Sequence, residues 1–281
     1  DRLPETGAPL ASQPTISRFE NRVSRTELYR MALVLVDQFL ASYVSPPQLI
    51  VLDFDDTEDP VHGEQEQARY DGYYGGYCFL PLHLYEGLSG RLITTIFKAK
   101  RFTGTQMLSV LTRLVKRLRH AWPDTLLIFR GDSHFAYPEV MQWIEAQAQL
   151  SYVTGLTSNA VVQTLARDVV EQAKRAYERD GGKITRFHST RYQAGTWSRS
   201  RRVVIKVEGS DQGVNTRFVV TDMEEARTKG LYQYIYCARG QAENEIKDHK
   251  RYLKSDRTSC HRFEANQFRV FLHSAAYVLL D

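Results

Sequence analysis

Several aspartates crowd one short stretch of the sequence, directly after a run of apolar residues. The stretch LIVLDFDDTED covers residues 49–59 and contains Asp53, Asp55, Asp56 and Asp59. On a β-strand, residues two apart point to the same face, so Asp53 and Asp55 can converge on one cation. The alternative is a solvated turn after the strand, because Asp and Thr are common turn formers.

A second acidic residue, Asp132, ends another apolar run, TLLIFRGDS at 125–133. In open α/β sheets, functional groups gather at the carboxyl ends of strands. Asp132 could equally cap the helix that follows it, because a carboxylate accepts hydrogen bonds from the first free backbone N–H groups of a helix.

A third group lies on one predicted helix near the end of the sequence: Tyr236, Arg239, Glu243 and Lys250. At about 100° per residue, these four side chains share a stripe about 60° wide. The stripe could be a solvated face on which Arg239 and Glu243 pair at i,i+4. It also suits a different role, in which the carboxylate binds a divalent cation and its neighbours hold phosphates.

Together these positions offer three carboxylates from two strand ends and a helix. Mg²⁺ prefers hard oxygen ligands and is usually held by a few carboxylates plus substrate phosphate. Two such ions about 3.5–4 Å apart stabilise both the attacking and the leaving oxygen of an in-line phosphodiester displacement. The constellation therefore predicts metal-assisted attack on a nucleic-acid backbone.

The elements expected to position these residues follow the order β-β-β-α-β-α-β. They are strands at 48–54, 75–87 and 91–101, a helix at 105–122, a strand at 125–133, a helix at 137–147 and a strand at 150–156. This order predicts an α/β fold of the ribonuclease H-like type, a mixed sheet flanked by helices. A doubly wound parallel fold would need a helix after the first strand, and we find no helical periodicity there.

Four segments follow from this pattern: an N-terminal arm and helix (1–47), the first part of the catalytic core (48–156), a β-rich insertion (157–230) and a C-terminal helical part of the core (231–281). Residues 1–17 are predicted to form an extended arm, and 24–44 a helix that opens with a capping box. A hairpin is expected around Gly209–Gly213. The chain starts without Met and stops within an apolar helical pattern, so we expect a piece of a longer protein.

The composition fits a nucleic-acid-binding protein of the cytosol. Of 281 residues, 37 are Lys or Arg and 33 Asp or Glu, giving a net charge of +4. Three cysteines without C-x-x-C spacing argue for a reducing compartment and against a disulfide framework or a zinc ribbon. The sequence contains neither a signal peptide nor an apolar run of membrane-spanning length.

The segment YCARGQAENEIKDHK fits the Y-x2-R-x3-E-x6-K signature of cut-and-paste DDE transposases of bacterial insertion sequences. LDFDDTEDPVHGEQE and FRGDSHFAYPEVMQW resemble the first-Asp and second-Asp blocks of that family. The resemblance implies a ribonuclease H-like core whose triad holds two Mg²⁺ or Mn²⁺ ions. Asp132 and Glu243 would be the second and third members, and Asp55, ahead of Thr57, the first. Asp53 shares the face of Asp55 and remains a competitor.

The same resemblance implies the reaction and its partners. Tyr236, Arg239 and Lys250 would hold phosphates of the transposon end. The chain would nick double-stranded DNA at the terminal inverted repeats, and the freed 3′-OH would attack target DNA. Such enzymes act as a homodimer in a synaptic complex, at the nucleoid in the bacterial cytoplasm.

Two other functions remain open. LDFDDT also resembles the motif of haloacid dehalogenase-type phosphatases, in which Asp53 would be the nucleophile and Asp55 the general acid. The strand order and the stripe on the last helix argue against that enzyme. The other alternative is a catalytically inactive, DNA-binding descendant of a transposase, which the presence of all three carboxylates disfavours.

Two basic segments and one tryptophan could add DNA contacts. The cations are Lys98, Lys100, Arg101, Arg199, Arg201 and Arg202. Exposed cations are more often solvated surface than binding sites, so these segments support DNA contact only weakly. Trp197 could stack on a flipped base, or it could be a core residue, which is the commoner role of Trp.

Overall fold

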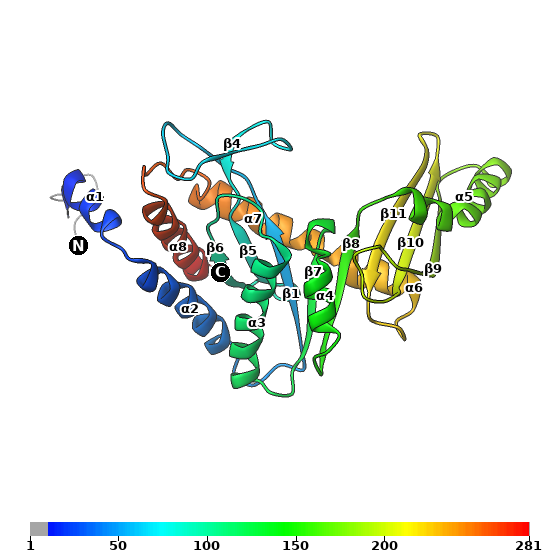
Figure 1. The fold of residues 1–281 in the computed structure, drawn as a ribbon, viewed down its shortest axis with the longest axis horizontal. Coiled ribbons are helices and arrows are strands. Elements are labelled where there is room, and N and C mark those ends of the chain that lie inside the picture. The colour runs from blue at the N-terminus through cyan, green and yellow to red at the C-terminus, as the bar shows by residue number, and fades with distance from the viewer. Residues whose placement is uncertain (1–10, 281) are drawn as a thin grey trace.

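A computed structural model describes residues 11–280, and its centre is one eight-stranded sheet (Figure 1). The strands run in the order β6 (Leu92–Ile96), β5 (Leu82–Glu86), β1 (Leu49–Asp56), β7 (Leu126–Gly131), β8 (Leu150–Leu156), β11 (Gly213–Thr221), β10 (Arg201–Ser210) and β9 (Ile184–Tyr192). β1, β7 and β8 are parallel, and β5 is antiparallel to both β1 and β6. This arrangement confirms the predicted ribonuclease H-like mixed sheet.

The alternation of side chains in β1 decides which face carries the aspartates. Ile50, Leu52 and Phe54 enter the main core, which also contains apolar residues of α2 (Arg25–Ala41), α3 (Gly104–Ala121), α4 (Pro138–Ile144) and α5 (Ala160–Asp180). Val51 packs instead on the opposite face, against the segment at Leu231. Asp53 and Asp55 share the face of Val51, because successive strand residues alternate.

That second face is covered by the C-terminal part of the chain. A π-helical turn (Leu231–Tyr236) and a 3₁₀ turn (Cys237–Arg239) lead into α7 (Gly240–Leu253), and α8 (Phe263–Leu280) follows. α7 packs through Ala242 and Ile246 onto Tyr85 of β5. The helices expected at this end of the chain are therefore present, and they bring Glu243 to the face that carries Asp55.

The predicted strand at 75–87 is wrong as a single element. The structure divides it into β4 (Gly76–Phe79) and β5, with Pro81 between them. Proline has no N–H to donate to a ladder, so Pro81 interrupts the strand hydrogen bonds at this point. β4 instead pairs with β2 (Asp59–Pro60) and β3 (Arg69–Asp71) in a small separate sheet.

The N-terminal arm is only partly as expected. Residues 1–10 lie outside the described residues, but residues 13–17, predicted as extended, belong to α1 (Gln13–Asn21). Pro14 sits in the first turn of α1, where its missing N–H costs nothing. Glu20 at the end of α1 accepts two hydrogen bonds from Arg269 of α8, at 2.9 and 3.1 Å. The predicted capping box of Ser24 and Glu27 does open α2.

The β-rich insertion extends the core sheet. α5 comes first, and β9, β10 and β11 then add to the sheet through the pairing of β11 with β8. The predicted hairpin is formed by β10 and β11, with Asp211 and Gln212 in its turn. In Figure 1 these strands and α5 project from the core at the end away from α1. The insertion ends with the short α6 (Thr228–Gly230), directly before the π-helical turn.

Candidate active site

One arginine, Arg239, forms ion pairs with both Asp55 and Glu243. The Nη1 atom of Arg239 lies 3.3 Å from Oδ2 of Asp55, and its Nη2 atom lies 2.9 Å from Oε1 of Glu243. Arg239 and Glu243 therefore make the i,i+4 pair that a solvated helix face predicts, but Arg239 also reaches the end of β1. The side chains of Asp55 and Arg239 are mostly buried, whereas that of Glu243 is about half exposed.

The register between β1 and β7 places Asp132 close to Asp55. β1 and β7 are parallel, with Phe54 opposite Gly131. The same register continued by one residue places Asp55 beside Asp132. Asp132 also caps a short 3₁₀ helix (Ser133–Phe135), because its carboxylate accepts a hydrogen bond of 2.8 Å from the backbone N–H of His134. The capping role expected as an alternative is thus present together with the proximity to Asp55.

The charges of these groups influence one another. Burial raises the pKa of Asp55 to about 7; Arg239 lowers it, and the carboxylates of Asp132 and Glu243 raise it further. Burial lowers the pKa of Arg239, but the surrounding carboxylates outweigh this and leave it above its ordinary value. Three carboxylates thus surround one buried guanidinium, and two of them raise the pKa of the third. Such a site gains from additional positive charge.

The donor set fits Mg²⁺ in chemistry, although the three carboxylates are not drawn together. Within residues 11–280, no three His, Cys, Asp or Glu side chains lie close enough to hold one ion. Arg239 lies between Asp55 and Glu243 and supplies the positive charge there. All three candidate ligands are carboxylate oxygens, the hard donors that Mg²⁺ and Mn²⁺ take.

Asp53 has a different environment from Asp55. It is 1% exposed and forms a two-pronged ion pair with Arg130, whose Nη2 donates to Oδ2 at 2.6 Å and whose Nε donates to Oδ1. The register places Arg130 directly opposite Asp53 on β7. Gly87 makes room for the pair, since a Cβ atom there would lie 2.3 Å from Nη2 of Arg130. Both oxygens of Asp53 are therefore already occupied.

Arg130 is the residue of this site that sequence reasoning missed. Besides Asp53, it donates through Nη1 to the backbone carbonyl of Ile235 at 2.6 Å, one residue before Tyr236. It thereby joins β1 and β7 to the segment that leads to Glu243. The available signal was an arginine within the apolar run LLIFRG, because Arg is almost never fully buried unless it is paired.

Tyr236 lies against the turn that Asp132 caps. A Cβ atom on Gly155 of β8 would stand 2.8 Å from the hydroxyl of Tyr236 and 2.7 Å from the backbone nitrogen of Ser133. Burial raises the pKa of Tyr236, so its hydroxyl stays protonated and can donate to an anion. Only glycine allows this approach.

We therefore expect Gly155→Ala to displace Tyr236 or the Asp132 turn. Overpacking of this kind costs about 1–3 kcal/mol of unfolding free energy, and it should also impair any activity that depends on Tyr236. Urea unfolding measures the first effect. Gly195→Ala is the control, because a Cβ atom there meets nothing within 4 Å. Equal stability of the two variants would show that the close approach is unimportant.

Lys250 lies two turns farther along α7 than Glu243. Its ammonium donates to the backbone carbonyl of Glu58 at 2.5 Å, in the loop after β1. Burial lowers its pKa, and the nearby carboxylates of Asp256, Glu58 and Asp59 oppose that effect. Lys250 therefore holds the loop after β1 against α7.

Asp56 and Asp59, the other two aspartates of the opening stretch, are structural. Asp56 pairs with the buried Lys98 at 2.8 Å. Asp59 is 1% exposed and accepts a hydrogen bond of 2.5 Å from the hydroxyl of Thr258. Burial raises the pKa of Asp59 to about 7.

The stability of the protein should therefore depend on the ionisation of Asp59. Because its folded pKa lies above the unfolded value of 3.8, the folded state binds the proton more tightly. Stability then falls as the pH rises from about 4 to about 7. Asp59→Asn keeps the shape without the charge and should raise Tm by about 5 °C at pH 8, with little change at pH 4.5.

Differential scanning calorimetry at both pH values measures this effect. Asp124→Asn, at an exposed position, is the control and should change Tm at neither pH. A lower Tm of Asp59→Asn at pH 8 would contradict the prediction.

Most of the residues that could add DNA contacts interact with other parts of the protein instead. Lys98 and Arg201 are buried in ion pairs with Asp56 and Glu145, and Arg202 is buried and donates to the backbone carbonyl of Met223. Trp197 is 6% exposed in the main core, which is the commoner role that the sequence analysis favoured over stacking on a flipped base. Its ring packs against Tyr192 and beneath Arg201.

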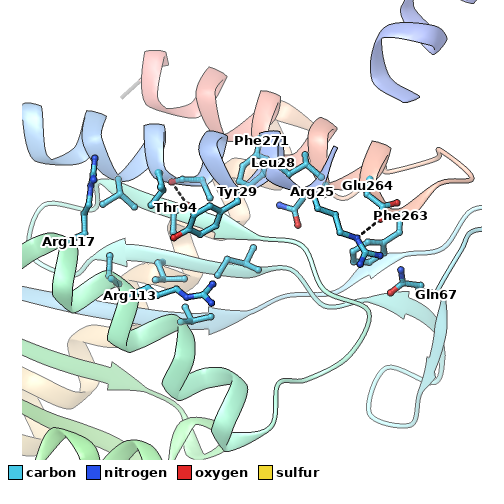
Figure 2. Close-up of a pocket in the computed structure, with 18 residues that line it drawn as sticks. Arg25, Leu28, Tyr29, Gln67, Thr94, Arg113, Arg117, Phe263, Glu264 and Phe271 are labelled. Atoms are coloured by element: carbon cyan, nitrogen blue, oxygen red, sulfur yellow. Dashed lines mark hydrogen bonds and ion pairs between the residues drawn. The ribbon is translucent and has the colours of Figure 1, made fainter. Parts of the chain in front are cut away.

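A separate cavity of about 510 Å³ lies between α2, α3 and α8 (Figure 2). It is lined mainly by apolar residues such as Leu28, Val36 and Phe271, with Arg25, Arg113 and Arg117 among the polar ones. Figure 2 shows Arg25 paired with Glu264 at one end of this cavity. Asp55, Asp132 and Glu243 do not line it, so it is distinct from the acidic site.

The comparison with protein families agrees with the resemblance. The whole chain, residues 1–281, matches the family described as transposase DDE domain group 1. Among solved structures, the chain is similar to a piggyBac transposase synaptic complex with hairpin DNA, with 14% identity and a TM-score of 0.43. That match covers 94% of this chain and 54% of the other, so this chain spans about half the length of that transposase. No curated protein matches. The chain belongs to the transposase DDE domain family.

Proposed function

We propose that this chain is the catalytic part of a DNA transposase, which cleaves at the ends of its element and transfers them into target DNA. The observation that carries the proposal is the arrangement of Asp55, Asp132 and Glu243 around Arg239. The β1–β7 register brings the first two together, and Arg239 links the first to the third. They are the three residues that we assign to the Asp-Asp-Glu triad of the family.

In this proposal Asp55, Asp132 and Glu243 hold two Mg²⁺ or Mn²⁺ ions. Bound ions of this kind activate water and neutralise charge on the phosphate under attack. Positive charge at the carboxylates would release Arg239, whose planar guanidinium matches the geometry of a phosphate. Tyr236 can donate its hydroxyl to the same anion. Lys250 adds a cation at the loop after β1.

The phosphatase alternative conflicts with the position of Asp53. An aspartyl nucleophile must reach the substrate phosphorus, but Asp53 is buried and both its oxygens accept hydrogen bonds from Arg130. The element after β1 is also a small antiparallel sheet rather than a crossover helix. Asp55 lies at the end of the strand, where the aspartate of a two-metal site is needed.

The proposal is tested by metal-dependent strand cleavage. The purified chain is incubated with a supercoiled plasmid carrying the ends of its element, in Mg²⁺, Mn²⁺ or EDTA. We expect nicking that leaves 3′-OH ends, followed by joining of those ends to other DNA, in either metal and none in EDTA. Hydrolysis of p-nitrophenyl phosphate without nicking would favour the phosphatase. DNA binding without nicking in either metal would favour an inactive descendant.

The proposal extends to the partners of the chain. Two element ends must be held together for transfer, so two copies of the chain would assemble on the DNA, at the nucleoid. No helix among residues 11–280 is long and apolar enough to cross a membrane. Light scattering of the chain with and without an end duplex measures the stoichiometry, and one chain for each pair of ends would contradict the dimer.

A further inference from the structure

A second cluster of charge lies beyond Glu243, at the far end of α7. There an open groove of about 620 Å³ is lined by the last turns of α7 and the turn that follows. Its cations are Lys247, Lys250, Arg251, Lys254 and Arg257. Asp248 and Asp256 are the only carboxylates that line it, so positive charge prevails.

Four of these cations are free. Lys247, Arg251, Lys254 and Arg257 are exposed, and their side chains make no hydrogen bond or ion pair with any residue that the structure describes. By contrast, Lys98 and Arg201, two of the cations that the sequence singled out, are buried in ion pairs. The groove therefore presents cations whose charge is available to a ligand.

Stabilisation of the helix end explains only part of this cluster. Cations in the last turn of a helix interact favourably with its dipole, but the effect fades within one turn. Lys254 and Arg257 follow the last helical residue, Leu253. Lys254 has a φ of +55°, in a left-handed conformation for which glycine or asparagine is usual. A lysine at this position suits a role for its charge.

The groove is in line with the acidic site. At about 100° per residue, Glu243, Lys247 and Lys250 share a stripe about 60° wide, and Lys254 follows at the cap. From Glu243 to Lys254 the helix rises about 16 Å. One DNA strand passes about five phosphates over that length of its axis.

We propose that this groove binds the phosphodiester backbone of duplex DNA beside the scissile bond, and guides it along α7 away from Glu243. The inference rests on the proposed function for the identity of the DNA. The ligand class follows from the chemistry: free, exposed cations in an open polar groove attract a regularly spaced polyanion. Contacts of this kind position the duplex without reading its sequence.

The test is the salt dependence of binding, measured without a divalent metal. The full chain is titrated into a fluorescein-labelled 30-base-pair duplex of arbitrary sequence in EDTA, and polarisation is recorded between 50 and 300 mM NaCl. The variant Arg251→Gln/Lys254→Asn/Arg257→Gln removes three charges, and asparagine suits the left-handed position. We expect affinity at 100 mM NaCl to fall about tenfold or more, and the salt slope to shrink by about 2 to 3.

The control variant, Arg30→Gln/Lys116→Gln/Arg175→Gln, removes three exposed charges from α2, α3 and α5. It should change affinity less than threefold. An equal loss in both variants, or no loss in the groove variant, would overturn the proposal. The metal-free assay separates this inference from the proposed function: a chain that never nicks plasmid, yet loses binding with the groove variant, would refute the function and keep the groove.

Discussion

Glu243→Gln should reduce metal-dependent DNA cleavage by about a thousandfold or more. The substitution keeps the size of the side chain and removes one negative charge. Loss of a ligand that stabilises transition-state charge costs several kcal/mol, and each 1.36 kcal/mol is tenfold in rate. Asp55→Asn should have an effect of the same size. Plasmid nicking in Mg²⁺ and in Mn²⁺ measures both.

Neither substitution should unfold the protein. The Glu243 side chain is 47% exposed, and its ion pair with Arg239 is of the weak i,i+4 kind. Asp55→Asn should even stabilise the metal-free chain at pH 8, because burial raises the pKa of Asp55 to about 7. Glu178→Gln, at an exposed position of α5, is the matched control and should cleave normally. Cleavage by Glu243→Gln at the wild-type rate would falsify the triad.

Asp53→Asn should act differently, by lowering the free energy of unfolding of the protein. It leaves the guanidinium of Arg130 buried without its counter-charge. Breaking a buried ion pair from one side costs about 3–5 kcal/mol. Urea unfolding should show that loss, and the double variant Asp53→Leu/Arg130→Met should recover part of it, because the pair is then replaced by apolar side chains.

Asp37→Asn is the matched control for this second prediction. Asp37 pairs with Arg117 of α3, but both side chains are more than 40% exposed. An exposed pair of this kind contributes about 1 kcal/mol or less. If Asp53→Asn kept full stability and lost only cleavage, Asp53 would be the first catalytic aspartate and Asp55 would not.

The sequence predicted the parts of the site that depend on local pattern. Alternation along β1 placed Asp53 and Asp55 on one face, and helical periodicity placed Arg239 and Glu243 on one stripe; the structure has both arrangements. The strand order likewise followed from the apolar runs. What the sequence left open was the choice between the two aspartates, because periodicity treats them alike.

That choice depends on how β1 and β7 align. Their opposed residues Asp53 and Arg130 lie 77 positions apart in the sequence. Arg130 lies opposite Asp53 and engages both its oxygens, while Asp55, one pleat farther, lies beyond the reach of that ion pair. No spacing within either strand specifies how the two strands align. The break at Pro81 is a local signal of a different kind, and the expectation of one strand at 75–87 ignored it.

The bond from Arg130 to the carbonyl of Ile235 has a consequence for how this chain can vary. The chain that returns from the insertion rests on β10 and β11 through Leu231 and Tyr232, and Arg130 fastens it to β7 as well. The exposed β10–β11 turn at Asp211 and Gln212 could therefore lengthen or shorten without moving Glu243. Relatives should vary in length at that turn while keeping a buried arginine at the position of Arg130.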